Sequence, residues 1–321
     1  MMARRIRVRS LAKINLDLRV LNKRPDGFHD LRTVFQTVSL GDTIEIQYSS
    51  GRSSININSS FNIPDNIIEN AADRVLSATG ATGRIEFVLQ KRIPLGGGLG
   101  GGSSNAAAVL LALPVLLKKP LGIEKLMELA ASLGSDVPYF LLGGTAVGLG
   151  RGTELYPLPD LTTPPALLIT PGVHVSTADA YHRLGRELTS EGGGNMMNAF
   201  QAVAWGIGGS RSPADWGVEN DFESVVFRQH PQLESIKGKL LKLGARPALM
   251  SGSGSTIFGI FQSRQHRDLA KRRFREEFAA DQVYPISFVS RSQYRALWRR
   301  QLGIPVGSKL WPWQSQDRYA K

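Results

Sequence analysis

The chain has 321 residues, of which 42% are apolar, 21% charged and 8% aromatic, a globular composition in a chain long enough that two domains are expected. It has no cysteine, and its five histidines show no metal-ligand spacing, which argues against disulfides, thiolate zinc sites and cysteine nucleophiles. No apolar run reaches the length of a membrane helix and the first residues lack the apolar core of a secretory signal, so a soluble cytoplasmic protein is expected.

The net charge of +12 is concentrated at the two ends of the chain. Residues 1–13 carry five basic and no acidic side chains, and residues 291–321 carry seven basic against one acidic, which leaves a net +1 for residues 14–290. The basic ends, the second of which also contains three tryptophans, suit a nucleic-acid-binding module, whereas a solvated or body-packed tail is the simpler explanation. The nearly neutral body gives no electrostatic signal for nucleic acid.

The first half of the chain predicts strands, then a helix, a strand, a glycine-rich loop and further helices. Alternating apolar residues from Ile14 to Val20 predict an early strand with one buried face. Apolar residues at helical spacing between Asn66, a good N-cap, and Gly80, a good stop, predict a capped helix. Strands at 42–48 and 84–90 and a helix at 123–133 complete this half.

The second half predicts antiparallel strands alternating with helices, an α+β arrangement. The proline-rich segment 157–165 predicts a crossing between domains, and from Gly303 the chain lacks periodicity and is expected to be loosely held. The expected elements are strands at 166–170 and 283–289, helices at 232–243 and 265–278, and two apolar stretches around a small-residue loop at 247–261. After Ser290, a short basic helix is expected to present one apolar face, made of Tyr294, Leu297, Trp298 and Leu302.

Residues 94–108 read PLGGGLGGGSSNAAA, with six glycines in the seven positions from Gly96 to Gly102. A glycine backbone enters positive φ and approaches a ligand closely. The serines that follow are expected to cap a helix rich in alanine, whose first N–H groups are free. This pattern predicts a phosphate site, with a flexible hinge as the alternative. A Walker A loop is excluded because no lysine follows the glycines, and a dinucleotide motif is a weak match because this loop does not open the first βαβ unit.

The same loop resembles the phosphate loop of the GHMP kinases, the superfamily of galactose, homoserine, mevalonate and phosphomevalonate kinases. Together with Ala12–Ile46, Gly134–Gly152, Val218–Val226 and Met250–Phe261, it resembles the 4-diphosphocytidyl-2-C-methyl-D-erythritol kinases within that superfamily. The resemblance extends from about residue 8 to residue 290, in the family's order, and leaves the last thirty residues unexplained.

The resemblance implies an α+β, two-domain GHMP kinase fold. It implies an N-terminal ATP domain like the second domain of ribosomal protein S5 at 1–160, a ferredoxin-like C-terminal domain of α/β layers at 161–290, and a basic C-terminal extension at 291–321. The implied reaction transfers the γ-phosphoryl group of ATP to the 2-hydroxyl of 4-diphosphocytidyl-2-C-methyl-D-erythritol in non-mevalonate isoprenoid biosynthesis. Mg²⁺ is expected to bind mainly through the ATP phosphates, and neither nucleic acid nor a membrane is an expected partner.

The resemblance also implies two catalytic residues, Asp136 in GSDVPYF and Lys13 in AKINL. Phosphoryl transfer needs a base for the hydroxyl proton and positive charge at the reacting centre. Asp136 is therefore expected to take the proton, and Lys13 to keep that carboxylate ionised and to steady the attacking oxygen. The alternatives are a helix cap for Asp136 and a solvated surface lysine for Lys13.

For the substrate, the resemblance implies a cytosine site in which aromatic faces hold the base and a polar side chain contacts its edge. Phe28 in PDGFHD and Tyr181 in HVSTADAY are the implied faces and His29 the edge contact, with phenylalanine here in place of the family's usual tyrosine. Asn15 and Thr177 are further implied substrate contacts. The alternatives are that Phe28 packs in the core and that His29 is a loop histidine with its hydrogen bonds satisfied. For the substrate, the alternative is a different small alcohol such as homoserine or mevalonate.

On the nucleotide side, the resemblance implies that main-chain amides and two hydroxyls surround the triphosphate and that two further residues lie near the adenine. The turn Ser251–Ser255 is interpreted either as a second turn against the substrate phosphates or as a tight strand connection. The implied nucleotide-binding residues are Asn66 and Lys91 near the adenine, and Pro94, Leu95, Gly96, Gly97, Gly98, Leu99, Gly100, Gly101, Gly102, Ser103 and Ser104.

Overall fold

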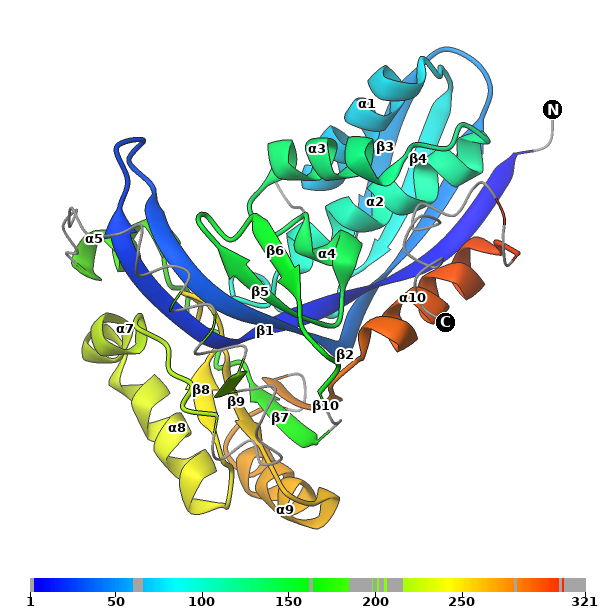
Figure 1. Ribbon diagram of the computed structural model, residues 1–321. Coiled ribbons are helices and arrows are strands. Elements are labelled where there is room, and N and C mark those ends of the chain that lie inside the picture. Colours follow the sequence, from blue (N-terminus) through cyan, green and yellow to red (C-terminus); the bar gives the residue numbers. More distant parts are fainter. Residues whose placement is uncertain are drawn as a thin grey trace.

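The described part of the chain forms two β-sheets with helices packed against them, and a long two-stranded ribbon crosses the middle of the molecule (Figure 1). This architecture confirms the predicted α+β fold. Within the described part, no helix is long and apolar enough to cross a membrane. The computed structural model describes residues 3–59, 66–161, 164–184, 216–279 and 282–305, and singly residues 198, 201, 205, 206 and 308.

The first sheet has the strand order β3, β4, β2, β5, β6, and β1 pairs with β2. Its pairs are antiparallel except for β3 with β4, and α1, α2 and α3 lie together over one face (Figure 1). The predicted capped helix is confirmed, because Asn66 accepts the N–H of Ile68 and Gly80 ends α1. The elements are β1 (Arg4–Lys23), β2 (His29–Ser49), β3 (Ser54–Ser59), α1 (Ile67–Thr79), β4 (Arg84–Gln90), α2 (Gly101–Leu117), α3 (Ile123–Leu133), α4 (Tyr139–Leu142), β5 (Thr145–Leu149) and β6 (Glu154–Pro157).

Strand β1 differs from the expected strand with one buried face, because residues 10–18 are all buried. Val8 and Leu11 pack in the core that contains α1 and α2, whereas Ile14 and Leu16 pack in the core between the two sheets. The strand therefore lies between two apolar layers, and a polar residue in its middle is removed from bulk water.

The second sheet is antiparallel with the order β10, β7, β9, β8. Three described helices lie between the first and second strands of this sheet along the chain, and one helix lies between the third and fourth. The strands and their helical connections therefore follow the β-α-β-β-α-β plan of the predicted ferredoxin-like C-terminal half. The chain passes from the first sheet to the second within the proline-rich segment, of which residues 162 and 163 lie outside the described residues. The elements are β7 (Pro165–Ile169), α5 (Thr177–Leu184), α7 (Glu223–Gln229), α8 (Pro231–Lys242), β8 (Ala248–Met250), β9 (Ile257–Ile260), α9 (Arg264–Arg275) and β10 (Val283–Ser287).

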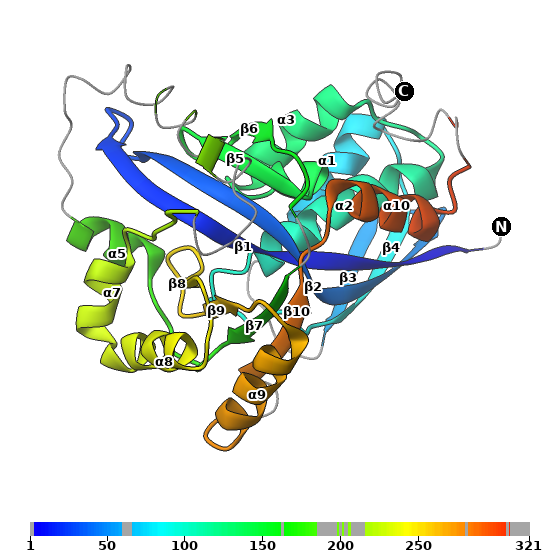
Figure 2. The ribbon, with the colours of Figure 1, turned by 60° about the horizontal axis from the view of Figure 1, so that its bottom comes forward.

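Helix α10 (Arg291–Leu302) returns from the second sheet to lie beside β1 and α2 (Figure 2). Its buried side chains Tyr294, Trp298 and Leu302 join the core that contains α2, which confirms the predicted apolar face. The segment expected as a separate extension is therefore, as far as residue 305, packed into the first half of the molecule. The driving force is burial of its apolar face, which also removes Trp298 from any base-stacking role. Trp311 and Trp313 lie outside the described residues.

Candidate functional site

Two adjoining cavities lie beside the glycine-rich loop, between the two sheets. The larger, of about 790 Å³, is bordered by β1, β2, α5 and the segments around residues 135 and 151, and we call it the side-chain cavity. The smaller, of about 550 Å³, follows residues 94–103, and we call it the loop cavity. Gly98, Gly100, Thr177 and Ser253 line both cavities, so a ligand in one reaches the edge of the other.

The main chain of the glycine-rich loop forms one wall of the loop cavity. Gly98 and Gly100 have φ values of 76° and 67°, a region that other residues rarely adopt. A Cβ on Gly98 would overlap the carbonyl oxygen of Ser251, so a second segment comes too close for any side chain here. Helix α2 begins at Gly101, and its first N–H groups lack partners within the helix, so they are donors of a kind that suits an anion.

Of the two serines after the loop, Ser103 lines the loop cavity and Ser104 does not. Gly100 is the N-cap of α2 and makes no side-chain capping bond, so the prediction that the serines cap this helix is wrong. Ser103 lies in the first turn and lines the loop cavity. The buried Ser104 hydroxyl instead donates to the Leu11 carbonyl oxygen at 2.7 Å, so the expected contact of Ser104 with a triphosphate is replaced by a tether between α2 and β1.

The turn Ser251–Ser255 joins β8 to β9 and packs on the glycine-rich loop. The Ser251 hydroxyl donates to the Gly98 carbonyl oxygen at 3.0 Å. Ser253 and Thr177, whose hydroxyl oxygens are 2.7 Å apart, line both cavities. The turn is thus a tight strand connection that also borders the cavities, and its contact with substrate phosphates stays a prediction.

Of the two residues expected near an adenine, Lys91 lines the loop cavity and Asn66 does not. Lys91 lines the loop cavity, and its ammonium lies 2.6 Å from the Asp42 carboxylate. Burial lowers the pKa of Lys91, and the negative charge of Asp42 opposes this shift. The Asn66 side chain instead caps α1 and does not belong to the lining of the loop cavity, which Ile67 lines in its place.

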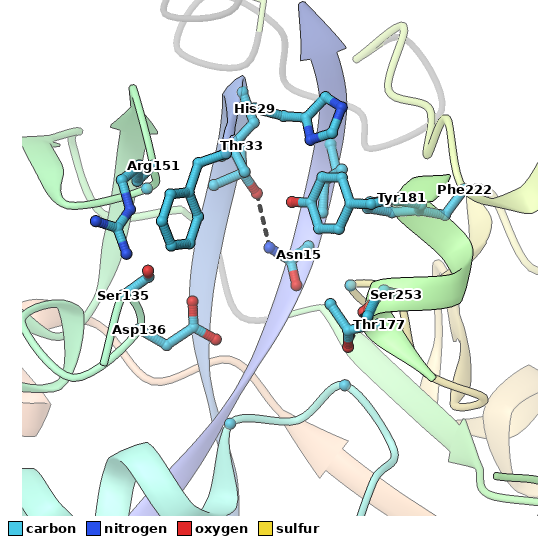
Figure 3. Close-up of a pocket in the computed structure, with 18 of the residues that line it drawn as sticks. Asn15, His29, Thr33, Ser135, Asp136, Arg151, Thr177, Tyr181, Phe222 and Ser253 are labelled. Atoms are coloured by element: carbon cyan, nitrogen blue, oxygen red, sulfur yellow. Dashed lines mark hydrogen bonds between the residues drawn. The ribbon is translucent and has the colours of Figure 1, made fainter. Parts of the chain in front are cut away.

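Lys13 and Asp136 come together in the side-chain cavity. The Lys13 Nζ lies 3.3 Å from an Asp136 carboxylate oxygen, with 4% and 34% of the two side chains exposed. This burial excludes the solvated-lysine alternative. Asp136 lies in the turn between α3 and α4, and α4 has Pro138 as its N-cap, so Asp136 caps no helix. Its carboxylate points into the cavity (Figure 3).

A chain of hydrogen bonds fixes the Lys13 ammonium. It donates to the Asn15 amide oxygen at 2.6 Å. The Asn15 amide nitrogen donates to the Thr33 hydroxyl at 2.7 Å, the bond that is dashed in Figure 3. The Thr33 hydroxyl in turn donates to the Asp17 carbonyl oxygen at 2.8 Å. A Cβ on Gly100 would lie 3.2 Å from the Lys13 Cε, so the lysine side chain borders the glycine-rich loop. The ammonium is therefore held at the junction of the two cavities.

Aromatic side chains also line the side-chain cavity. The His29 ring stacks on Tyr181 with centroids 4.9 Å apart (Figure 3), and burial, with a smaller effect of the Asp136 charge, raises the pKa of Tyr181 to about 12. Phe28 is 49% exposed, which excludes core packing, and the Arg151 guanidinium lies 3.6 Å from its ring centre. Each of the two expected stacking rings thus has a partner within the protein.

Sequence reasoning missed several residues that line the side-chain cavity. Arg151 carried a local signal, since the glycines on both sides of it, Gly150 and Gly152, have positive φ and form a tight turn. The others carry no local signal, because they lie on elements far apart in the sequence. The missed lining residues include Thr33, Ser135, Arg151, Phe222 and Ser253.

The described residues include no group of three or more His, Asp or Glu side chains placed to hold a metal ion. The loop cavity presents main-chain N–H groups and the Lys91 ammonium instead, a donor set that suits anionic oxygen. The donors of the loop cavity thus suit an anionic ligand, and the side-chain cavity offers both aromatic and polar side chains.

Comparison with known families matches two segments of the chain. Residues 66–144 match the GHMP kinases N terminal domain, and residues 197–280 match the GHMP kinases C terminal domain. The first match contains the whole glycine-rich loop and Asp136. Helix α10 lies outside both matched segments.

Several relatives carry the name 4-diphosphocytidyl-2-C-methyl-D-erythritol kinase. One from Solibacter usitatus is 51% identical over 318 residues, which cover 98% of each chain, and one from Syntrophus aciditrophicus is 42% identical over 80% of this chain and 90% of its own. A crystal structure of 4-(cytidine 5'-diphospho)-2C-methyl-D-erythritol kinase is 34% identical, with a TM-score of 0.73 over 88% of this chain and 99% of that one. A homoserine kinase from Cytophaga hutchinsonii, at 22% identity and a TM-score of 0.67 over 89% and 95% of the two chains, shares the fold.

Proposed function

The chain belongs to the 4-diphosphocytidyl-2-C-methyl-D-erythritol kinases of the GHMP superfamily, and we propose that it transfers the γ-phosphoryl group of ATP to the 2-hydroxyl of 4-diphosphocytidyl-2-C-methyl-D-erythritol. The observation that carries this proposal is the contact between Lys13 and Asp136 at the junction of the two cavities. A phosphoryl donor in the loop cavity and an alcohol in the side-chain cavity would meet at this pair.

The loop cavity suits the triphosphate of ATP because its wall is main chain. The three phosphate groups of ATP need several N–H donors at short range. The start of α2 supplies these donors, and it has no large side chains there that would keep the phosphates away. Within this proposal, Gly98 and Gly100 hold the phosphates, and Lys91 and Ile67 border the adenosine end.

The side-chain cavity suits a cytidyl alcohol because both aromatic side chains and a carboxylate line it. Within this proposal, Phe28, Tyr181 and His29 bind the cytosine, and Asn15 and Thr177 contact the sugar alcohol or its phosphates. The alcohol would then lie near Asp136 while its base is held at a distance.

The transfer step forms a bond between the substrate oxygen and the γ-phosphorus and breaks the bond between that phosphorus and the bridging oxygen, so ADP leaves. Asp136 accepts the proton of the 2-hydroxyl, a role that typically accelerates transfer by about 10²- to 10⁴-fold. Lys13 holds the carboxylate in place through their 3.3 Å contact and stabilises the negative charge that develops on the transferred group.

Mg²⁺ fits this scheme as a companion of ATP. The residues of the loop cavity offer N–H donors and an ammonium, which suit phosphate oxygens and not a cation. We therefore propose that the metal is held mainly through the ATP phosphates, where it supplies charge neutralisation.

The decisive experiment incubates the purified full chain with labelled ATP, Mg²⁺ and the cytidyl alcohol and identifies the phosphorylated position. Homoserine and mevalonate serve as competing acceptors, because kinases that act on them share the fold. Label on the 2-hydroxyl of the cytidyl substrate is expected. Transfer to homoserine or mevalonate, with none to the cytidyl alcohol, would overturn the proposal.

A further inference from the structure

We propose that helix α10 is a positioning element for the turn that carries Asp136, and that Tyr294 is the positioning residue through which it acts. The inference rests on the proposed function, in which Asp136 is the base. It adds a role for a helix that lies outside both segments matched to the GHMP kinase domains.

The contact is a buried hydrogen bond between two elements far apart in the sequence. The Tyr294 hydroxyl donates to the carbonyl oxygen of Phe140 in α4 at 2.6 Å. Burial raises the pKa of Tyr294, so the hydroxyl stays protonated and can donate. The Phe140 ring reaches the glycine-rich loop, because a Cβ on Gly100 would lie 2.8 Å from its Cζ. Tyr294 therefore holds a residue that packs directly behind the N-cap of α2.

The chain around α4 is shaped to receive α10. Gly143 follows α4 with a φ of 67°, and a Cβ there would overlap the Tyr294 ring. One turn earlier on α10, the Arg291 guanidinium donates to the carbonyl oxygens of Thr145 and Leu158, the latter at 3.1 Å. The Tyr294 ring and the Arg291 guanidinium are thus two separate contacts through which α10 holds the segment that follows α4.

A ring of hydrogen bonds transmits this anchoring to the start of α4. The Gly144 N–H donates to the Thr37 hydroxyl at 3.0 Å, and the Tyr139 hydroxyl donates to the Gly144 carbonyl oxygen at 2.7 Å. Since the Tyr139 proton is used in this way, the Thr37 hydroxyl donates to Tyr139 at 2.7 Å. Tyr139 lies three residues after Asp136, so the base is tied to β2 and to the segment under α10.

The main chain of the Asp136 turn is held by four short-range hydrogen bonds. The Val137 and Phe140 N–H groups donate to the Gly134 and Val137 carbonyl oxygens at 3.2 and 3.1 Å, and the Leu141 and Gly143 N–H groups donate to the Pro138 and Tyr139 carbonyl oxygens at 3.0 and 2.9 Å. These bonds are all local, so they do not fix the turn against β1, where the carboxylate must keep its position beside Lys13. A shift of about 1 Å at a reacting group is costly for catalysis. A helix that fixes the Phe140 carbonyl limits such shifts.

The test removes the Tyr294 hydroxyl alone. Tyr294→Phe keeps the ring, and we expect it to lower kcat about fivefold to tenfold while both KM values change less than twofold. Amide hydrogen exchange in residues 137–143 is expected to speed up by a similar factor. The control, Leu302→Ala, removes a buried side chain at the other end of the same helix. It should lower Tm more than Tyr294→Phe and leave both kcat and the exchange of residues 137–143 unchanged.

The outcomes separate this inference from the proposed function. Unchanged exchange in Tyr294→Phe, or faster exchange with unchanged kcat, would overturn the positioning role, as would an equal loss of kcat in Leu302→Ala. If the unmodified chain phosphorylates no cytidyl alcohol, the proposed function fails, and hydrogen exchange alone decides whether α10 holds the turn. Should Tyr294→Phe not fold, Arg291→Met removes the second anchor and is expected to change exchange and kcat in the same direction.

Discussion

The loop cavity and the side-chain cavity are built from different parts of the polypeptide. The wall of the loop cavity comes mainly from one continuous segment, residues 94–103, and consists largely of main chain. The side-chain cavity takes its polar groups from β1, β2, the turn before α4 and α5, and these groups are side chains. Phosphate groups present negatively charged oxygens on several sides, so main-chain amides are enough to bind them. An alcohol, in contrast, must be oriented and deprotonated at one oxygen atom, which requires placed side chains.

This difference predicts how the two cavities respond to substitution. In the loop cavity, a change matters when it adds atoms, because the main chain has no room for them. In the side-chain cavity, a change matters when it removes a functional group. Four experiments test this comparison, beginning with the largest expected effect.

Asp136→Asn removes the base and keeps the shape of the side chain. We expect kcat to fall by at least about a hundredfold with the affinity for ATP preserved, because the loop cavity is untouched. Steady-state kinetics and ATP titration by calorimetry measure the two quantities. Near-normal turnover would remove Asp136 from the role of base.

Gly98→Ala adds one methyl group to the loop. The φ of 76° and the overlap with the Ser251 carbonyl oxygen predict a loss of ATP affinity of roughly 10- to 100-fold, since such backbone strain costs about 1–3 kcal/mol. Gly238→Ala in α8 is the matched control, because a Cβ there meets no atom within 4 Å. Equal ATP affinity in the two variants would contradict the role of the main-chain wall.

Phe28→Ala removes an exposed aromatic face from the side-chain cavity. Loss of one stacking contact is worth about 1–3 kcal/mol, so KM for the cytidyl substrate is expected to rise roughly tenfold while KM for ATP stays constant. The comparison of the two KM values within one variant is its own control. A change confined to KM for ATP would contradict the assignment.

Lowering the pH is expected to weaken binding of the cytidyl substrate, because the His29 ring becomes protonated. Burial, with a smaller effect of the Lys23 charge, lowers the pKa of His29, so its ring is neutral at pH 7 and can accept a hydrogen bond. Because substrate binding would favour the neutral ring, protonation at lower pH competes with binding. KM for the cytidyl substrate, measured from pH 5 to pH 8, should be constant above the ordinary histidine value of about 6.5 and rise by a fewfold below it.

The matched variant for the pH experiment is His29→Gln, which has no titrating ring. Its KM is expected to be independent of pH over the same range. A rise centred above pH 6.5, or one that persists in His29→Gln, would assign the effect to another group.

The predictions from local sequence patterns are confirmed for elements that pack through a single apolar face. Asn66 and Gly80 bound α1 as expected, and the apolar face of α10 is buried as expected. The prediction for β1 was wrong about its faces, because alternation cannot reveal that a second sheet covers the other side. The capping serines were mispredicted because the left-handed Gly100 starts α2 before them.

The same division holds for the candidate site. Lys13, Asp136, Phe28, His29 and Tyr181 were expected from motifs, and they line one cavity. Their neighbour Phe222 was not expected, since a contact between distant residues leaves no trace in either local segment. Arg151 was missed although the glycines on both sides of it gave a local signal. The partner of Lys91, the buried Asp42, was missed for the same reason.

The amino-acid sequence by itself determined the chemistry available to this protein: a side-chain-free loop at a helix start, a carboxylate in a turn, and a lysine in an apolar strand. These are properties of neighbouring residues, and short-range sterics and hydrogen bonding decide them. Only the tertiary structure decided that the lysine meets the carboxylate, and that the last described helix donates a hydrogen bond to α4. Such contacts join residues more than a hundred positions apart, and their geometry depends on how the whole chain fills its core.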